Sequence, residues 1–229
     1  MGDLAAVIFD FDGTLADTEW PIYERARVAA EGLGAVLTPE LWATHAVGVS
    51  HTESYWGPLA EAMGAAFDEA TFDAARAAVT DVPMSRDSAT ITPGAAELVH
   101  ALHAEGVQLA VASGSDREWL EHHLRRFGLT DRFVHLVGID HAGVRAGKPA
   151  PDLYDAAVAE LGVDPAATVA VEDTRRGIES AQAAGLAAVV AVPTRLTAHQ
   201  DLSAADLVVA SLADLTPASL RQLVGPPRF

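Results

Sequence analysis

The chain has 229 residues, of which 50% are hydrophobic and none is cysteine. This hydrophobic share is enough for a buried core, and the absence of cysteine excludes disulfide scaffolds, thiolate metal sites and hydrolases that attack through sulfur. Fifteen Lys and Arg against 32 Asp and Glu give a net charge of −17, which argues against nucleic acid and anionic membranes as partners.

The N-terminal segment passes directly from Gly2-Asp3 into an apolar run, without a basic region or a cleavage site. No stretch approaches the roughly 18 uninterrupted apolar residues of a membrane helix. We therefore expect a cytoplasmic protein without a membrane partner. The sequence leaves open whether it is a monomer or a homodimer.

Apolar runs without polar alternation recur along the chain and are typical of strands buried on both faces of a parallel sheet. The predicted strands are residues 4–9, 107–112, 133–137, 168–171, 187–192 and 207–209. Helical segments separate them at residues 95–105, 153–161 and 174–184, and Ser115 with Glu118 forms a capping-box pattern that predicts a further helix capped by Ser115. This alternation predicts an α/β fold with a Rossmann-like, doubly wound parallel sheet.

Residues 17–87 break the alternation, because they contain only helical patterns, at residues 22–31, 39–46, 52–63 and 71–78. We interpret them as a small α-helical cap domain inserted into a core domain of residues 1–16 and 88–229. Hinges are expected near residues 15–18 and 86–90. The cap tryptophans Trp20, Trp42 and Trp56 are expected to pack rather than to recognise a substrate.

Two carboxylates, Asp10 and Asp12, follow the first predicted strand, and Glu172-Asp173 ends a later one. Ligands of parallel α/β sheets bind beyond the carboxyl ends of the strands, so these groups should meet. Carboxylates so close together stay ionised only beside a cation, and such oxygen ligands suit Mg²⁺. The alternative for Asp10 and Asp12 is a solvated turn or a helix cap.

Two further strand ends carry groups that suit phosphate. Ser113-Gly114-Ser115 lies between a strand and a helix start, where a hydroxyl and free N–H groups can bind an anion. Gly147-Lys148-Pro149 places one lysine in a chain that is poor in basic residues. The alternatives are an ordinary turn for the first segment and a surface lysine for the second.

In order, Asp10-Phe11-Asp12-Gly13-Thr14-Leu15, Ser113, Gly147-Lys148-Pro149 and Val171-Glu172-Asp173 resemble the four motifs of the haloacid-dehalogenase-like superfamily. The similarity is greatest to its small-helical-cap branch, which includes phosphoglycolate phosphatase and β-phosphoglucomutase. It covers essentially the whole chain, and the cap is its least specific part.

The resemblance implies a phosphatase mechanism. Asp10 would attack phosphorus and form an aspartyl-phosphate, while Asp12 would act as general acid and then general base. The implied ligands of Mg²⁺ are Asp10, the Asp12 backbone carbonyl and Asp173, with Glu172 close by. The implied phosphate-binding groups are Ser113, the Gly114 N–H and Lys148.

The expected substrate is a small phosphorylated metabolite, either a sugar phosphate or a phosphoglycolate-like compound. His51 in the cap is a possible substrate contact, although a histidine at a helix start is often simply solvated. Mutase relatives carry a histidine after the first hinge and basic residues in the cap loop, where this chain has Trp20-Pro21-Ile22, Val47 and His51. That difference favours hydrolysis over a β-phosphoglucomutase-like activity. A non-catalytic, phospho-responsive binding module is the more distant alternative.

Overall fold

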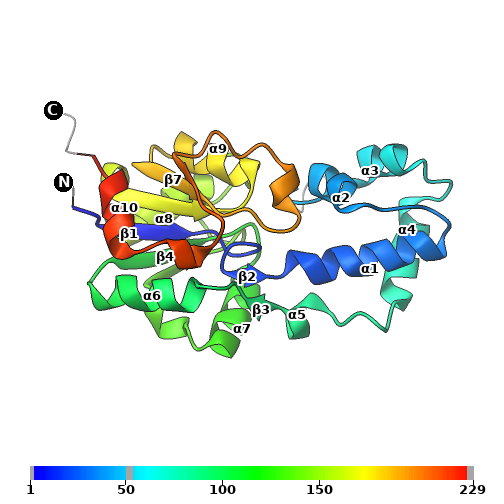
Figure 1. Cartoon of the computed structure of the whole chain (residues 1–229), viewed down its shortest axis with the longest axis horizontal. Coiled ribbons are helices and arrows are strands. Elements are labelled where there is room, and N and C mark those ends of the chain that lie inside the picture. Colours follow the sequence, from blue (N-terminus) through cyan, green and yellow to red (C-terminus); the bar gives the residue numbers. More distant parts are fainter. Residues whose placement is uncertain (1–2, 50–53, 226–229) are drawn as a thin grey trace.

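The computed structural model of the chain describes residues 3–49 and 54–225. Its centre is a six-stranded parallel sheet in the order β5-β4-β1-β6-β7-β8 (Figure 1). The strands are β1 (Ala6–Phe9), β4 (Gln108–Ala112), β5 (His135–Val137), β6 (Thr168–Glu172), β7 (Ala188–Ala191) and β8 (Leu207–Val208). All six predicted strands are confirmed. Because β1 pairs with both β4 and β6, it is an inner strand of the sheet. The residues that follow β1 therefore emerge near the middle of the row of strand ends.

Helices cover both faces of the sheet, as expected for a doubly wound fold (Figure 1). Val7 and Phe9 of β1 pack into a hydrophobic cluster with α6 (Ala95–Ala104), α7 (Arg117–Phe127) and α10 (Pro217–Leu223). Ala6 and Ile8 point to the opposite face, onto α8 (Asp152–Leu161) and α9 (Arg175–Ala183). The alternation of side chains along a strand thus places each half of the apolar run in a separate core layer.

Short elements connect these layers. The antiparallel pair β2 (Ala16–Asp17) and β3 (Thr90–Ile91) lies at the two expected hinge segments. The 3-10 helices are η1 (Thr130–Arg132), η2 (Pro165–Ala167), η3 (Thr197–His199) and η4 (Leu212–Asp214). The pairing of β2 with β3 brings the start and the end of the inserted helical segment together. The chain therefore enters and leaves this segment at the same place.

The inserted helices lie beyond the carboxyl ends of the strands, to one side of the sheet (Figure 1). They are α1 (Glu19–Gly32), α2 (Pro39–His45), α3 (Trp56–Met63), α4 (Glu69–Ala78) and α5 (Ser85–Ser88). We call α1–α5 the cap. It has its own apolar cluster, in which Trp42 and Trp56 are buried and Trp56 stacks on Phe72 with ring centroids 4.9 Å apart. The helix predicted from residue 52 begins at Trp56 within the described residues.

One segment of the core docks on the cap. Leu196, which follows β7, is buried within the apolar cluster of the cap. The Arg195 guanidinium lies 3.8 Å from the centroid of the Trp20 ring, and Gln200 Nε2 donates to the Ala43 carbonyl at 3.0 Å. These contacts join the segment after β7 to the cap.

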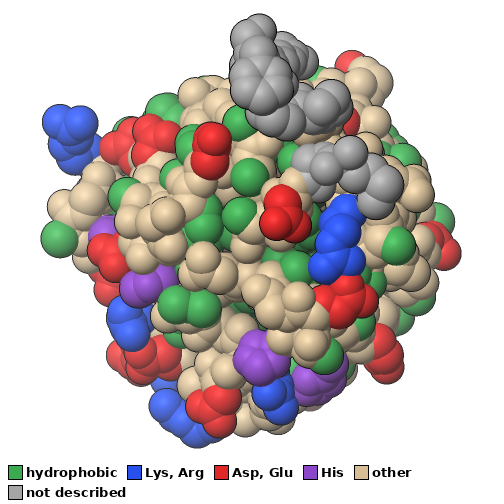
Figure 2. Space-filling view, turned by 90° about the vertical axis from the view of Figure 1, so that its left-hand side faces the viewer, with side chains coloured by type: hydrophobic (Ala, Val, Ile, Leu, Met, Phe, Trp, Pro, Cys, Tyr) green, Lys and Arg blue, Asp and Glu red, His purple; other side chains and the backbone are tan. Residues whose placement is uncertain are grey.

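Acidic and basic side chains are interspersed over the end of the molecule that carries the two termini, opposite the cap (Figure 2). Among the helices of the described ranges, none combines the length and the apolar character needed to cross a bilayer. The acidic groups singled out in the sequence gather instead at the sheet edge beneath the cap, around a cavity.

Candidate active site

The carboxyl ends of the strands and the cap enclose a cavity of about 310 Å³. Phosphate-site and metal-site residues expected from the sequence meet there, and the cavity is lined by Asp10, Asp12, Ser113, Gly114, Lys148 and Asp173. Glu172 is fully buried behind this lining. His51 lies outside the described residues. Segments far apart in the chain therefore converge at one edge of the sheet, as parallel topology requires.

Three carboxylates form a cluster on the core side of the cavity. Asp10, Glu172 and Asp173 each offer an oxygen within 4.8 Å of the others. Both oxygens of Asp173 are buried and have no hydrogen-bond partner among the described residues. Because a buried carboxylate without partners is costly, this set of hard oxygen donors fits a bound Mg²⁺.

Gly13 explains how the backbone after β1 approaches Asp173 so closely. Its φ is +90°, and a Cβ atom at this position would lie 2.2 Å from Asp173 Oδ2. Any side chain would therefore be strained and would displace the carboxylate. Glycine here leaves room for the loop after β1 to pass directly over the acidic cluster.

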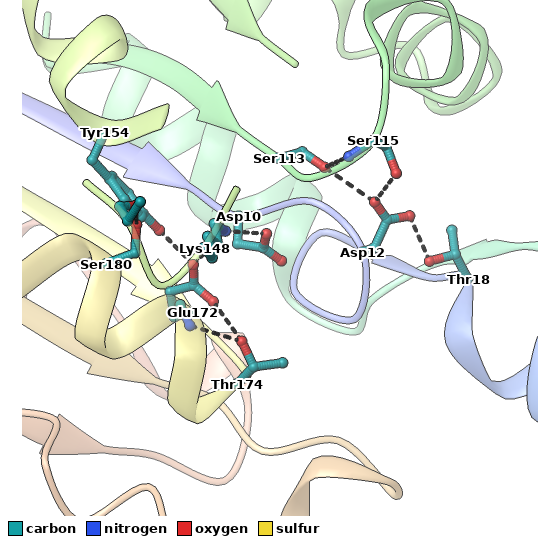
Figure 3. A network of polar contacts seen from close by, with 12 residues as sticks. Asp10, Asp12, Thr18, Ser113, Ser115, Lys148, Tyr154, Glu172, Thr174 and Ser180 are labelled. Carbon is teal, nitrogen blue, oxygen red and sulfur yellow. Dashed lines mark hydrogen bonds and ion pairs between the residues drawn. The ribbon is translucent and has the colours of Figure 1, made fainter. Parts of the chain in front are cut away.

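Lys148, the only lysine of the chain, lies between two of these acids. Its Nζ donates to Asp10 Oδ1 and to Glu172 Oε1, each at 2.5 Å (Figure 3). The Tyr154 hydroxyl donates to the same Glu172 oxygen at 2.6 Å, and the Thr174 hydroxyl donates to the other at 3.4 Å. Glu172 is thus held from several sides and in turn orients the lysine toward Asp10.

Burial dominates the titration of this cluster. It raises the pKa of Asp10 from 3.8 to about 7, against the opposing charge of Lys148 and together with the like charge of Glu172. Burial, followed by Asp10 and Glu172, holds the pKa of Asp173 well above its usual value. Burial alone would lower the pKa of Lys148, but Asp10 and Glu172 outweigh it and raise that pKa. One ammonium does not neutralise three acids, so the pocket favours a further cation.

The Asp12 carboxylate is turned toward the side of the cavity away from Lys148 (Figure 3). Its Oδ1 accepts from the Thr18 hydroxyl at 2.7 Å and from Trp119 Nε1 at 2.8 Å. Its Oδ2 accepts from the Ser115 hydroxyl at 2.6 Å and from the Ser113 hydroxyl at 3.1 Å. Four donors from the hinge, the loop after β4 and α7 therefore fix this carboxylate in one orientation.

The predicted role of Ser115 as a helix cap is wrong. The N-cap of α7 is Asp116, whose carboxylate accepts from the Trp119 backbone N–H at 2.8 Å. Both residues are good caps, and the sequence does not decide between neighbours. With the cap position taken by Asp116, the Ser115 hydroxyl is free to bind Asp12.

Sequence reasoning missed Trp119 and Tyr154, which contact Asp12 and Glu172 respectively. Both lie near the starts of helices that follow core strands, α7 and α8. The only signal was their position within the first turns of helices whose N-termini point to the site. Aromatic residues at such positions are equally typical of core packing.

The cap contributes the wall of the cavity that faces the acidic cluster. Glu19 and Ile22 come from α1, and residues 46–49 follow α2. Burial, with the nearby charges of Asp12 and Asp10, raises the pKa of Glu19 to about 8. No hydrogen bond or ion pair to the Glu19 side chain occurs among the described residues, so its carboxyl is available to a ligand.

The family model of the haloacid dehalogenase-like hydrolases matches residues 4–185. The chain therefore belongs to this hydrolase family, which confirms the resemblance carried by the four motifs. It is an enzyme, and the alternative of a non-catalytic binding module is set aside.

Proteins that align with almost the whole chain support its membership of this family. Hexitol phosphatase B of Escherichia coli K12 is 28% identical over 220 residues, which cover 95% of this chain and 96% of that protein. The structure of a haloacid dehalogenase family hydrolase from Deinococcus radiodurans with bound phosphate and sodium is 29% identical, with a TM-score of 0.78 and coverage of 99% and 100%. The structure of CbbY from Rhodobacter sphaeroides in complex with xylulose 1,5-bisphosphate is 26% identical, with a TM-score of 0.71 and coverage of 95% and 99%.

Proposed function

We propose that the protein is a Mg²⁺-dependent phosphatase that hydrolyses a small phosphorylated metabolite through an aspartyl-phosphate on Asp10. The observation that carries the proposal is the position of Asp10, which lies at the end of β1 with Lys148 Nζ at 2.5 Å and the unpartnered Asp173 in the same cluster. The relatives named as a phosphatase or crystallised with phosphate or a sugar phosphate support the same reaction class.

In the first step, an Asp10 oxygen attacks phosphorus opposite the ester oxygen. The P–O bond to the leaving group breaks, and Asp12 gives a proton to the departing alcohol. In the second step, Asp12 takes a proton from water, which attacks phosphorus and releases inorganic phosphate from Asp10. Asp12 lies on the cap side of Asp10, next to the hinge residue Thr18, where a leaving group would emerge.

The other residues stabilise the charge on the transferring group. The Lys148 ammonium, the Ser113 hydroxyl and the Gly114 N–H are proposed to bind the phosphoryl oxygens. Asp10, Asp173 and the Asp12 backbone carbonyl are proposed to hold Mg²⁺, with Glu172 beside them. When bound, this ion would neutralise the phosphoryl group and the nucleophile so that two anions can approach.

We also propose that residues 17–87 act as a cap domain, which closes the cavity over the leaving group. The position of α1–α5 over the strand ends and the paired hinge strands β2 and β3 support this division. The cytoplasmic location and the monomeric or dimeric state expected from the sequence stay predictions.

The direct test is release of inorganic phosphate from p-nitrophenyl phosphate with Mg²⁺ and with EDTA. We expect turnover only with Mg²⁺, and a phosphoryl group on the peptide that contains Asp10 after rapid acid quench. Full activity in EDTA, or label on another residue, would overturn the proposal. Turnover without a sugar bisphosphate activator would separate hydrolysis from a mutase activity.

A further inference from the structure

The loop that carries Lys148 has few backbone donors of its own. Its sequence is Gly147-Lys148-Pro149-Ala150-Pro151, and the two prolines have no backbone N–H. The Ala150 N–H is used within the loop, where it donates to the Gly147 carbonyl at 3.1 Å. The loop is therefore tied to the rest of the core largely through its carbonyl oxygens, which need donors from elsewhere in the chain.

The helix α9 supplies two such donors from one of its faces. Arg176 donates twice to the Lys148 carbonyl, from Nε at 3.1 Å and from Nη2 at 2.7 Å. The hydroxyl of the buried Ser180 donates to the Ala150 carbonyl at 2.6 Å. Residues 176 and 180 are four apart and therefore lie on the same side of the helix. Of these two anchors, Arg176 is the one that binds the backbone of Lys148 itself.

The aliphatic stem of Arg176 lies close to the cap. A Cβ atom placed on Gly48, in the segment that follows α2, would lie 3.8 Å from Arg176 Cδ, which is an ordinary van der Waals distance. The same atom would lie 3.6 Å from the methyl group of Thr174, the N-cap residue of α9. Arg176 therefore lies between the cap segment and the backbone of Lys148, and it is restricted at its stem and at its guanidinium.

The position of the Lys148 backbone determines where its ammonium can reach. A lysine side chain is a flexible stem with a compact charge at its tip. At this tip, Nζ contacts both Asp10 and Glu172, and Glu172 is itself held by the Tyr154 hydroxyl (Figure 3). If the backbone of Lys148 shifts, the ammonium should stay with the buried Glu172 and move away from Asp10, the proposed nucleophile. A misplacement of about 1 Å in a reacting group can cost about 100-fold in rate.

We propose that Arg176 is a positioning residue for the phosphoryl transfer. It fixes the backbone of Lys148 so that the ammonium reaches Asp10 and the phosphoryl oxygens together. Arg176 acts through Lys148 alone, since it is not part of the cavity wall formed by the described residues. This inference rests on the proposed phosphatase activity and adds to it a residue that lies behind the reaction centre.

Arg175 offers a matched control at the neighbouring position of α9. Its Nε contacts Glu179 at 2.8 Å and its side chain is exposed, so it serves the helix surface rather than the lysine loop. Arg175→Met and Arg176→Met remove the same charge from the same helix turn. A general effect of charge or of helix stability should appear in both variants, whereas an effect through Lys148 should appear only in Arg176→Met.

The test measures kcat and KM for p-nitrophenyl phosphate and, by calorimetry, the affinity for orthovanadate, all with saturating Mg²⁺. Orthovanadate can adopt the trigonal-bipyramidal shape of a phosphoryl group in transfer, so its binding reports on the groups that stabilise that state. For Arg176→Met we expect kcat to fall and the vanadate dissociation constant to rise by about tenfold, with KM changed by less than about threefold. Arg175→Met should stay within about twofold of the wild type in all three quantities, because it loses only an exposed ion pair.

A conservative variant separates the hydrogen bonds of Arg176 from its packing. Arg176→Gln keeps an amide that can donate one hydrogen bond to the Lys148 carbonyl, so kcat should fall less than in Arg176→Met. Circular dichroism and the melting temperature show whether each variant folds. Wild-type kcat and vanadate affinity in folded Arg176→Met, or equal losses in Arg175→Met, would overturn the inference. If Arg176→Met does not fold, wild-type values in Arg176→Gln overturn it instead.

The wild-type protein separates this inference from the function on which it rests. If it hydrolyses p-nitrophenyl phosphate under no metal condition, the proposed phosphatase activity fails and the inference fails with it. If it is active and the Arg176 variants match it in kcat and vanadate affinity, only the positioning role fails.

Discussion

The indole Nε1 of Trp119 donates a hydrogen bond of 2.8 Å to Asp12 Oδ1, the carboxylate proposed to act as acid and base. Trp119 lies on α7 in the core, whereas Thr18, the other donor to this oxygen, lies at the hinge. The indole therefore holds Asp12 from an element that does not belong to the cap.

Trp119→Phe keeps an aromatic ring against His123 but removes the N–H donor. A hydrogen bond to a charged group contributes roughly 1.5 kcal/mol, so we expect kcat to fall by about tenfold through misplacement of Asp12, with KM changed by less than about twofold. Trp20→Phe, whose ring packs on Tyr23 and Arg195, is the control. An unchanged kcat would exclude a positioning role for Trp119.

Asp10→Asn should abolish phosphate release, because the amide is a poor nucleophile and a poor metal ligand. The fold should persist, since Lys148 keeps its contact with Glu172. Circular dichroism and the melting temperature check the fold, and a phosphate-release assay checks the activity. Retained turnover would contradict the assignment of Asp10 as the nucleophile.

Gly177→Ala should impair both stability and activity, although alanine is the better helix former by about 1 kcal/mol. A Cβ atom at Gly177 in α9 would lie 1.9 Å from Glu172 Oε2. That carboxylate cannot move freely, because Lys148 and Tyr154 hold its other oxygen. Gly57→Ala in α3, where nothing lies within 4 Å of the added atom, should leave activity unchanged and raise the melting temperature. A stabilised and active Gly177→Ala variant would contradict the tight packing at Glu172.

Mg²⁺ should stabilise the protein more at pH 8 than at pH 5. Without a metal, folding raises the pKa of Asp10 from 3.8 to about 7. The protonated acid thus contributes stability that is fully present below pH 3.8 and is lost as the pH rises through about 7. A cation bound at Asp10 and Asp173 replaces that proton, so its effect should grow over the same interval. Melting temperatures with and without Mg²⁺, at constant ionic strength, measure this, and equal shifts at both pH values would contradict the proposed site.

Much of the core was predictable because its strands are buried on both faces. Such strands need continuous apolar runs, and these mark both the strands and the points at which they end. Asp10, Ser113 and Asp173 were therefore found from their positions after those runs, and the structure brings them to one cavity. Lys148 was found because a lysine is rare in this chain and lies between prolines and glycine.

The residues that surround these side chains in the site were not predictable in the same way. Trp119, Tyr154 and Glu19 lie on helices, where the direction of a side chain depends on the rotation and the crossing angle of the helix. Neither is set by local sequence. Leu196 completes the apolar cluster of the cap from a core loop, and such a contact depends on how the two parts are placed together.

The burial of Lys148 has a practical consequence, because this residue carries the only side-chain amine of the polypeptide. Protein labelled with ¹⁵N-lysine gives a single ammonium resonance, and that resonance comes from the proposed reaction centre without further assignment. Its shift and its exchange with solvent report directly on the ion pair with Asp10 as metal, phosphate or a substrate analogue is added. Amine-reactive reagents are likewise restricted to this position and the N-terminus. Because only an uncharged amine reacts, the rate of modification at Lys148 reports how firmly Asp10 and Glu172 hold its ammonium.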